Sequence, residues 1–175
     1  MLIRFVRHFL LAIQFFTRIP ITGRLAEWVG YSPTMLRNSA AYFPAVGWIV
    51  GVLSATVFAG IVNILPALPA TPWVAAVLST AFSILLTGAF HEDGLADTAD
   101  GLGGGLTREQ ALEIMKDSRI GTYGSAALLL AMLSKLSLLV LLYQIDLAWS
   151  VVGLFAAHVT SRLMPLFLIR AMAHV

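Results

Sequence analysis

Four long apolar stretches dominate the pattern of hydrophobic and polar positions in this sequence. They cover residues 41–65, 73–90, 125–143 and 147–169. A helix needs about 20 apolar residues to cross a bilayer, so each stretch is a candidate span, although the second is slightly short. A proline-rich connection follows the first stretch, and a tight turn at residues 144–146 joins the last two. The pattern predicts an all-α, polytopic membrane helical bundle with about four spans.

The composition supports the same class of protein. The 175 residues are 59% hydrophobic and 11% charged, compared with about 25% charged residues in an average soluble domain. So few polar groups cannot cover the outside of a water-soluble protein, and we expect one integral membrane domain over residues 1–175. Cys is absent, so a metal must be held by oxygen or imidazole ligands. The basic residues are spread along the chain rather than clustered, which argues against a nucleic-acid partner.

The N-terminal segment resembles a signal peptide only in part. It has a basic beginning and an apolar run, but Gln14, Thr17 and Arg18 interrupt the run, and no small-residue cleavage site follows. We therefore expect this segment to remain in the protein as a helix at the membrane interface.

Lys and Arg residues indicate the orientation of the spans. The two connections at residues 65–72 and 144–146 contain neither residue type. Basic residues instead precede the first span, lie between the second and third, and follow the fourth: Arg4, Arg7, Arg18, Arg24 and Arg37; Arg108, Lys116 and Arg119; and Arg170. By the positive-inside rule, these three regions face the cytoplasm.

Small residues in the first span predict a close helix contact. Gly47 and Gly51 form a Gly-x-x-x-Gly pair, which Ala55 and Ala59 continue along the same face. Packing inside one subunit explains this face, and the alternative is a dimer seam, so a homo-oligomer stays open.

The polar segment over residues 91–124 holds seven of the nine acidic residues of the chain. If the second helix continues past Phe90, Asp93, Asp97 and Asp100 lie at i, i+4 and i+7 on one helix face. Carboxylates so close to lipid repel one another unless a cation compensates them, and Mg²⁺ suits carboxylates that share it with substrate phosphates. We therefore expect these three residues to be metal ligands. The alternative is a solvated acidic loop.

Glycines follow the acids. The run over residues 101–105 includes Gly103 and Gly104, whose backbone N–H groups are free to approach a substrate phosphate. The alternative is a hinge between helices. The segment lacks the P-loop, zincin and EF-hand spacings, so neither zinc nor calcium is indicated.

A second helix is predicted to begin after Thr107, which has the chemistry of an N-cap, and to end at Arg119 or Ile120. Lys116 and Arg119 would then hold phosphate oxygens, with Asp117 as a further metal contact. The alternative is a set of ion pairs within the helix.

Two basic residues lie inside predicted spans, where charges are costly and usually paired. Lys135 is expected to pair with an acid or contact a substrate phosphate, and the alternative is a structural bridge. Arg162, one turn after His158, lies near the cytoplasmic end of its span, where it either snorkels to water or binds substrate.

Three motifs resemble the cobalamin synthase family, adenosylcobinamide-GDP ribazoletransferase. They are Leu-Ala-Ile-Gln-Phe-Phe-Thr-Arg-Ile-Pro at residues 11–20, Phe-His-Glu-Asp-Gly-Leu-Ala-Asp-Thr-Ala-Asp-Gly-Leu at 90–102 and Glu-Ile-Met-Lys-Asp-Ser-Arg-Ile-Gly-Thr-Tyr-Gly at 113–124. The resemblance implies a multi-pass enzyme of the bacterial inner membrane. It implies that α-ribazole or its 5′-phosphate is joined to adenosylcobinamide-GDP with release of GMP, using Mg²⁺. Members of the family continue with further membrane segments, so it also implies a C-terminally short form.

This chemistry suggests a role for each group of residues. His91 or Glu92 would accept the proton of the attacking hydroxyl, while Lys116 and Arg119 would stabilise phosphate charge. The competing functions are another Mg²⁺-dependent membrane phosphotransferase or prenyltransferase, and a transporter subunit without enzymatic activity.

Overall fold

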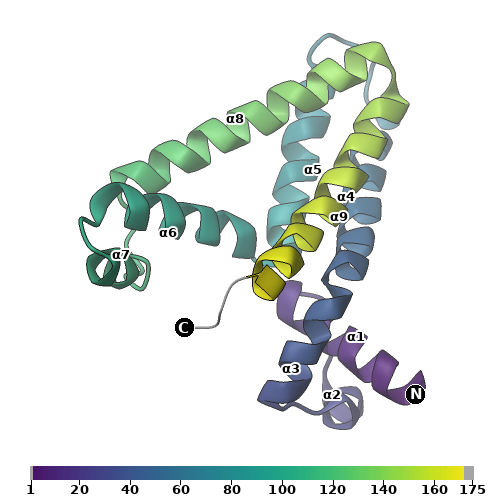
Figure 1. Ribbon diagram of the computed structural model, residues 1–175. Coiled ribbons are helices and arrows are strands. Elements are labelled where there is room, and N and C mark those ends of the chain that lie inside the picture. Colours follow the sequence, from purple (N-terminus) through teal and green to yellow (C-terminus); the bar gives the residue numbers. More distant parts are fainter. Residues whose placement is uncertain (1, 172–175) are drawn as a thin grey trace.

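The computed structural model describes residues 2–171, and every regular element within them is a helix (Figure 1). This confirms the predicted all-α class. In chain order the elements are α1 (Leu2–Phe16), α2 (Gly23–Val29), α3 (Pro33–Ser39), the short 3-10 helix η1 (Ala40–Tyr42), α4 (Phe43–Ile64), α5 (Thr71–Thr87), α6 (Phe90–Gly104), α7 (Arg108–Ile114), α8 (Thr122–Ile145) and α9 (Leu147–Ala171).

Three of the described helical segments are long and apolar enough to cross a membrane. They are Pro33–Ile64, which runs from α3 through α4, and the helices α8 and α9. A fourth span is counted only if α5 and α6 are taken together across a bend of 88°. The expectation of about four spans is confirmed, and the chain is a multi-pass membrane protein.

The bend between α5 and α6 corrects one expectation, because the second helix does not continue to Phe90. Gly88 and Ala89 both adopt left-handed backbone conformations, with φ of 67° and 60°. Such a pair ends a right-handed helix. The Arg18 N–H donates to Leu86 O over 2.7 Å, so the chain after α1 is fixed to the same bend. As a result, α6 lies across the end of α5, nearly at right angles to it.

The glycines of α4 allow it to pack closely on α9. A Cβ on Gly47 would lie 2.6 Å from the His158 carbonyl oxygen, and one on Gly51 would lie 3.1 Å from the Cα of Phe155. Both distances are too short for a side chain without movement of α9. The predicted close helix contact is therefore confirmed, and it lies within one chain.

Helix α1 begins the fold as predicted, with one face buried and the other exposed. Leu11, Ala12 and Phe16 are buried, and the Phe16 ring meets that of Phe43 edge to face, with centroids 4.0 Å apart. The exposed face carries Leu2 and Ile3, as expected of an interfacial helix.

The bundle has two distinct ends (Figure 1). The connection at residues 65–70 and the turn at Asp146 lie at one end, and neither contains Lys or Arg. Helices α1, α2, α3 and α7 and the last turns of α9 lie away from that end. The three basic regions of the sequence are therefore on the same side of the bundle.

The bend gives a test of stability. We expect Gly88→Ala to lower the free energy of unfolding by about 1–2 kcal/mol, because an L-residue is strained in the left-handed region and its Cβ would displace the Arg18 guanidinium. Denaturant unfolding of the detergent-solubilised chain, followed by circular dichroism, measures this change.

Gly94→Ala in α6 is the matched control. A Cβ there meets no atom within 4 Å, so helix propensity predicts a gain of roughly 0.5–1 kcal/mol. Equal effects of the two substitutions would contradict the role of the bend.

Candidate functional site

Polar residues gather at both ends of α6. The beginning of α6 borders a cavity between the membrane helices, which we call the polar cavity. The end of α6 meets the loop between α7 and α8, and we call this region the loop site. The polar cavity is lined by Ser83, Thr87, His91, Glu92, Lys135, Leu154, Ala157, His158, Ser161 and Arg162. The loop site is lined by Asp100, Gly104, Ile114, Asp117, Arg119, Gly121, Thr122 and Tyr123.

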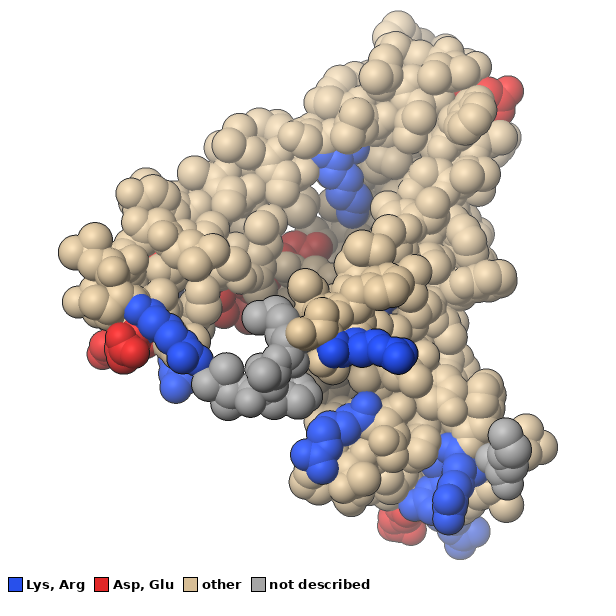
Figure 2. All heavy atoms as spheres, in the orientation of Figure 1, with Lys and Arg blue, Asp and Glu red and all other residues tan. Residues whose placement is uncertain are grey.

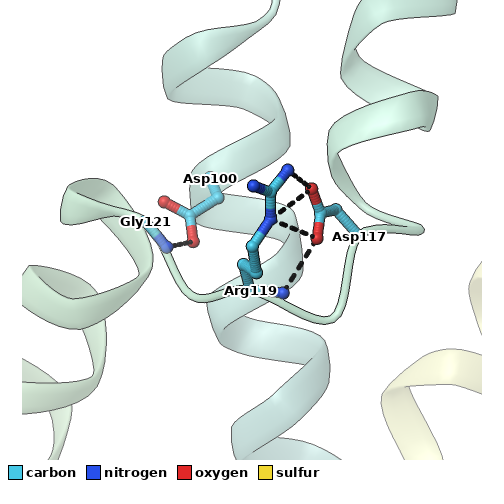
Figure 3. A network of polar contacts seen from close by, with 4 residues as sticks. All are labelled: Asp100, Asp117, Arg119 and Gly121. Atoms are coloured by element: carbon cyan, nitrogen blue, oxygen red, sulfur yellow. Dashed lines mark hydrogen bonds and ion pairs between the residues drawn. The ribbon is translucent and has the colours of Figure 1, made fainter.

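Asp100 connects α6 to the beginning of α8 (Figure 3). The residue is only 8% exposed, and its two carboxylate oxygens accept the N–H groups of Gly121 and Gly124 over 2.7 and 2.8 Å. The first N–H groups of a helix have no partner within the helix, and a negative charge there also suits the helix dipole. A Cβ on either glycine would collide with the carboxylate. Asp100 therefore acts as the cap of α8.

Asp117 and Arg119 form an exposed ion pair in the same loop (Figure 3). The Arg119 Nε–H lies 3.0 Å from both carboxylate oxygens, and the Arg119 backbone N–H donates to Oδ1 over 3.0 Å. These hydrogen bonds lower the pKa of Asp117 to about 2 and raise the pKa of Arg119. Both groups are charged at neutral pH.

The position of this pair corrects the predicted end of the second polar helix. Thr107 is the N-cap as expected, since its hydroxyl accepts the Gln110 N–H, but α7 ends at Ile114 rather than at Arg119 or Ile120. The Asp117 carboxylate captures a backbone N–H two residues later, and such a local bond competes with helix continuation. Lys116 is exposed in the loop that results.

The glycines at the end of α6 allow close packing rather than forming a hinge. The helix is continuous through Gly104. A Cβ on Gly101 would lie 2.6 Å from the Met115 side chain, and one on Gly103 would lie 2.5 Å from the Tyr123 ring. Gly104 lines the loop site, whereas the Tyr123 ring lies against Gly103.

Asp93 and Asp97 are one turn apart on α6, as predicted. Asp93 is exposed and Asp97 is half-buried, and neither forms an ion pair in the described part of the chain. Asp93 and Asp100 are about 10 Å apart along the helix axis. Within residues 2–171, no three His, Asp or Glu side chains are placed to hold one metal ion. The structure therefore does not bring the three predicted ligands together.

The polar cavity brings together four residues that the sequence suggested separately. His91 and Glu92 come from α6, Lys135 from α8 and Arg162 from α9, and the cavity volume is about 210 Å³. Figure 2 shows basic and acidic atoms set into the hollow between α8 and α9. His158 is the fifth ionisable residue of the cavity and was not predicted as a site residue, although its spacing of four from Arg162 puts both on one helix face.

The Arg162 side chain does not snorkel to water, so this part of the prediction is wrong. The side chain is 3% exposed, and Nη1 donates to the His158 carbonyl and the Ser161 hydroxyl, both over 3.1 Å. Its Nε has no hydrogen-bond partner. The guanidinium therefore lies inside the bundle and not in water.

Two neighbours of Arg162 also have unused polar atoms. His91 Nδ1 and Glu92 Oε2 are buried without hydrogen-bond partners. Buried polar atoms are normally satisfied, and three unsatisfied groups around one cavity indicate a site for a ligand.

Comparison with known proteins identifies the family. Residues 8–175 match the cobalamin-5-phosphate synthase family. The chain belongs to this family. The resemblance of its three motifs is thereby confirmed.

Two relatives in this family are named adenosylcobinamide-GDP ribazoletransferase. The protein of Albidiferax ferrireducens is 58% identical over 172 residues, which cover 98% of this chain and 61% of the relative. The protein of a Polaromonas species is 56% identical over 185 residues, covering 98% of this chain and 66% of the relative. The chain thus spans about three fifths to two thirds of the length of these relatives. No solved structure matches it.

Asp100 and Asp117, the two carboxylates of the loop site, allow a matched test of whether Asp100 anchors α8. We expect Asp100→Asn to lower the free energy of unfolding by about 1–3 kcal/mol, because an amide replaces a buried charged acceptor of two N–H groups. Hydrogen exchange at the amides of Gly121 and Gly124 should also become faster.

Asp117→Asn is the control, since it makes the same chemical change in an exposed pair. We expect it to alter the free energy of unfolding much less than Asp100→Asn does, because solvent screens an exposed ion pair. A similar loss from both variants would show that Asp100 does not anchor α8.

Proposed function

We propose that this chain acts in cobalamin biosynthesis as a transferase that joins α-ribazole or α-ribazole 5′-phosphate to adenosylcobinamide-GDP and releases GMP. The observation that carries the proposal is 58% identity, over 98% of the chain, to a relative named for this activity. The multi-pass fold agrees with an enzyme in a bacterial inner membrane.

The reaction exchanges a phosphoanhydride bond for a phosphate ester bond. A hydroxyl of the ribazole attacks the phosphorus that carries the cobinamide, the bond from this phosphorus to the oxygen of GMP breaks, and the hydroxyl proton is released. The enzyme must therefore neutralise charge on a pyrophosphate, align a hydroxyl and accept a proton.

Asp93 and Asp97 fit the requirement for Mg²⁺ better than Asp100 does. Both lie on one face of α6 and are free of ion pairs in the described chain, whereas the Asp100 carboxylate already accepts two N–H groups. Mg²⁺ binds through one or two carboxylates, several waters and substrate phosphates, so a preformed three-carboxylate cluster is not needed. When bound, Mg²⁺ neutralises pyrophosphate charge. Asp100 is then a positioning residue that fixes α6 against α8.

The remaining roles follow from the placement of each residue. Arg119 lines the loop site, and Lys116 is exposed in the same loop. Lys116 forms no ion pair in residues 2–171, whereas Arg119 is paired with Asp117, so a phosphate at Arg119 competes with that carboxylate. Gly104 lines the same site. His91 and Glu92 have buried, unpartnered acceptor atoms, so either residue accepts the hydroxyl proton.

The Mg²⁺ assignment predicts that Asp97→Asn lowers activity by at least about 100-fold while membrane insertion is unchanged, because one metal ligand loses its charge. The measurement is GMP release from membranes that contain the chain, incubated with adenosylcobinamide-GDP, α-ribazole and Mg²⁺. Chelation of divalent metal with EDTA should have the same effect on the unaltered chain.

Glu109→Gln removes one negative charge from the exposed first turn of α7 and should leave GMP release nearly unchanged. Near-normal activity of the Asp97 variant would remove Asp97 from the site. No GMP from the unaltered chain would contradict the proposed activity and leave the transporter alternative standing.

The proposed orientation places α6, α7 and the N-terminal helices in the cytoplasm, in agreement with the basic residues at their end of the bundle. We expect alkaline phosphatase, which is active only outside the cytoplasm, to be active when fused after Thr71 and inactive when fused after Thr107. The reverse result would overturn the orientation.

A further inference from the structure

We infer that the polar cavity binds the terminal phosphate of the ribazole substrate, with Lys135 and Arg162 as its cationic ligands. The inference rests on the proposed function and deepens it, since it assigns the 5′-phosphate that the family description implies to a separate site with named residues. This site lies at the beginning of α6 and is distinct from the acids that are proposed to face the pyrophosphate.

The first argument is the unused hydrogen-bonding capacity of Arg162. Only 3% of the residue's surface is exposed, and it lines the cavity. Its Nη1 bonds are made to groups of its own helix, while Nε has no partner. A buried guanidinium with a free donor is costly in a membrane protein unless a ligand completes its hydrogen bonds.

The second argument is charge. Lys135 and Arg162 bring two formal positive charges to the cavity, and Glu92 brings one formal negative charge. None of the three forms an ion pair within 4.0 Å, because the one such pair in residues 2–171 is Asp117 with Arg119. An anionic ligand balances this excess, and Arg with Lys is the usual combination for phosphate.

The third argument is the size and composition of the cavity. A volume of about 210 Å³ is enough for a phosphate group. The Ser83 and Thr87 hydroxyls already donate to the carbonyl oxygens of Thr80 and Ser83, so Lys135 and Arg162 supply the donors for a ligand. A terminal phosphate offers three oxygens to such a set of donors, whereas a phosphodiester offers two.

The fourth argument is the position of the cavity relative to the proposed metal face. Glu92 lines the cavity, and Asp97 lies about 7.5 Å further along α6. A ribose phosphate carries its phosphate and its free hydroxyls a short distance apart. A substrate anchored by its phosphate in the cavity therefore has its hydroxyls beside the Glu92 carboxylate. The Asp93 side chain lies roughly 100° around α6 from Glu92, and Asp97 lies roughly 140° around it.

The test compares binding of α-ribazole 5′-phosphate and α-ribazole to the purified, detergent-solubilised chain by calorimetry. EDTA is present and adenosylcobinamide-GDP is absent, so neither metal nor the second substrate contributes. We expect the phosphorylated ligand to bind about ten- to a hundredfold more tightly. Lys135→Gln and Arg162→Gln should each reduce this difference at least about tenfold without weakening the binding of α-ribazole.

Arg170→Gln is the matched control, because Arg170 is an exposed arginine on the same helix and loses the same charge. It should leave the difference intact. If Arg162→Gln does not fold, Arg162→Lys and Lys135→Gln test the inference instead. Arg162→Lys should keep part of the preference for the phosphorylated ligand, and Lys135→Gln should lose it. A variant that weakens both ligands equally indicates a structural role and overturns the inference.

Two further outcomes separate this inference from its alternatives. Phosphatidylglycerol, a phosphodiester lipid, should not compete with α-ribazole 5′-phosphate, and competition would assign the cavity to a lipid headgroup instead. Equal binding of the two ribazole ligands alongside GMP release overturns the phosphate site alone. A preserved binding difference without GMP release contradicts the proposed function and supports the site.

Discussion

The change of backbone handedness at Gly88 and Ala89 is the constraint on which the rest of the structure depends. Two consecutive left-handed residues turn the chain by 88° between α5 and α6. Ala89 is the one non-glycine residue with positive φ in residues 2–171, and such a conformation costs about 1–2 kcal/mol. The bond from Arg18 to Leu86 supports the bend from outside. Without the bend, α6 would continue the direction of α5, and His91 and Glu92 would lie away from α9.

Because α6 lies across the end of the bundle, it connects the polar cavity among the membrane helices with the loop site. Its beginning faces a cavity lined by buried charges, and its end is fixed by Asp100 to the N-terminus of α8. The glycines in its last turn let Met115 and Tyr123 lie directly against the helix backbone. One rigid helix of 15 residues therefore sets the spacing between the two sites.

The sequence predicted the helices well where apolar length decides them, because the ends of α4, α8 and α9 lie within three residues of the apolar stretches. The sequence-based prediction was wrong about helix ends that depend on local backbone conformation or on a single side-chain hydrogen bond. A left-handed Ala89 has no signal in a single sequence, so the bend was missed. The end of α7 depends on one carboxylate that captures a backbone N–H. The partners of Asp100 are 21 and 24 residues away, and such contacts follow only from the packed structure.

The charged residues of the bundle are arranged in a way that adds little to its stability. The pair of Asp117 with Arg119 is at the surface, where solvent reduces its contribution to the free energy of folding. Lys135, Arg162 and Glu92 surround one cavity but form no contact pair, although direct pairing would lower the cost of burial. A bundle selected for stability alone would pair these groups or replace them with apolar residues. Their separation leaves room and charge for a ligand, so the cost of keeping them apart is recovered when that ligand binds.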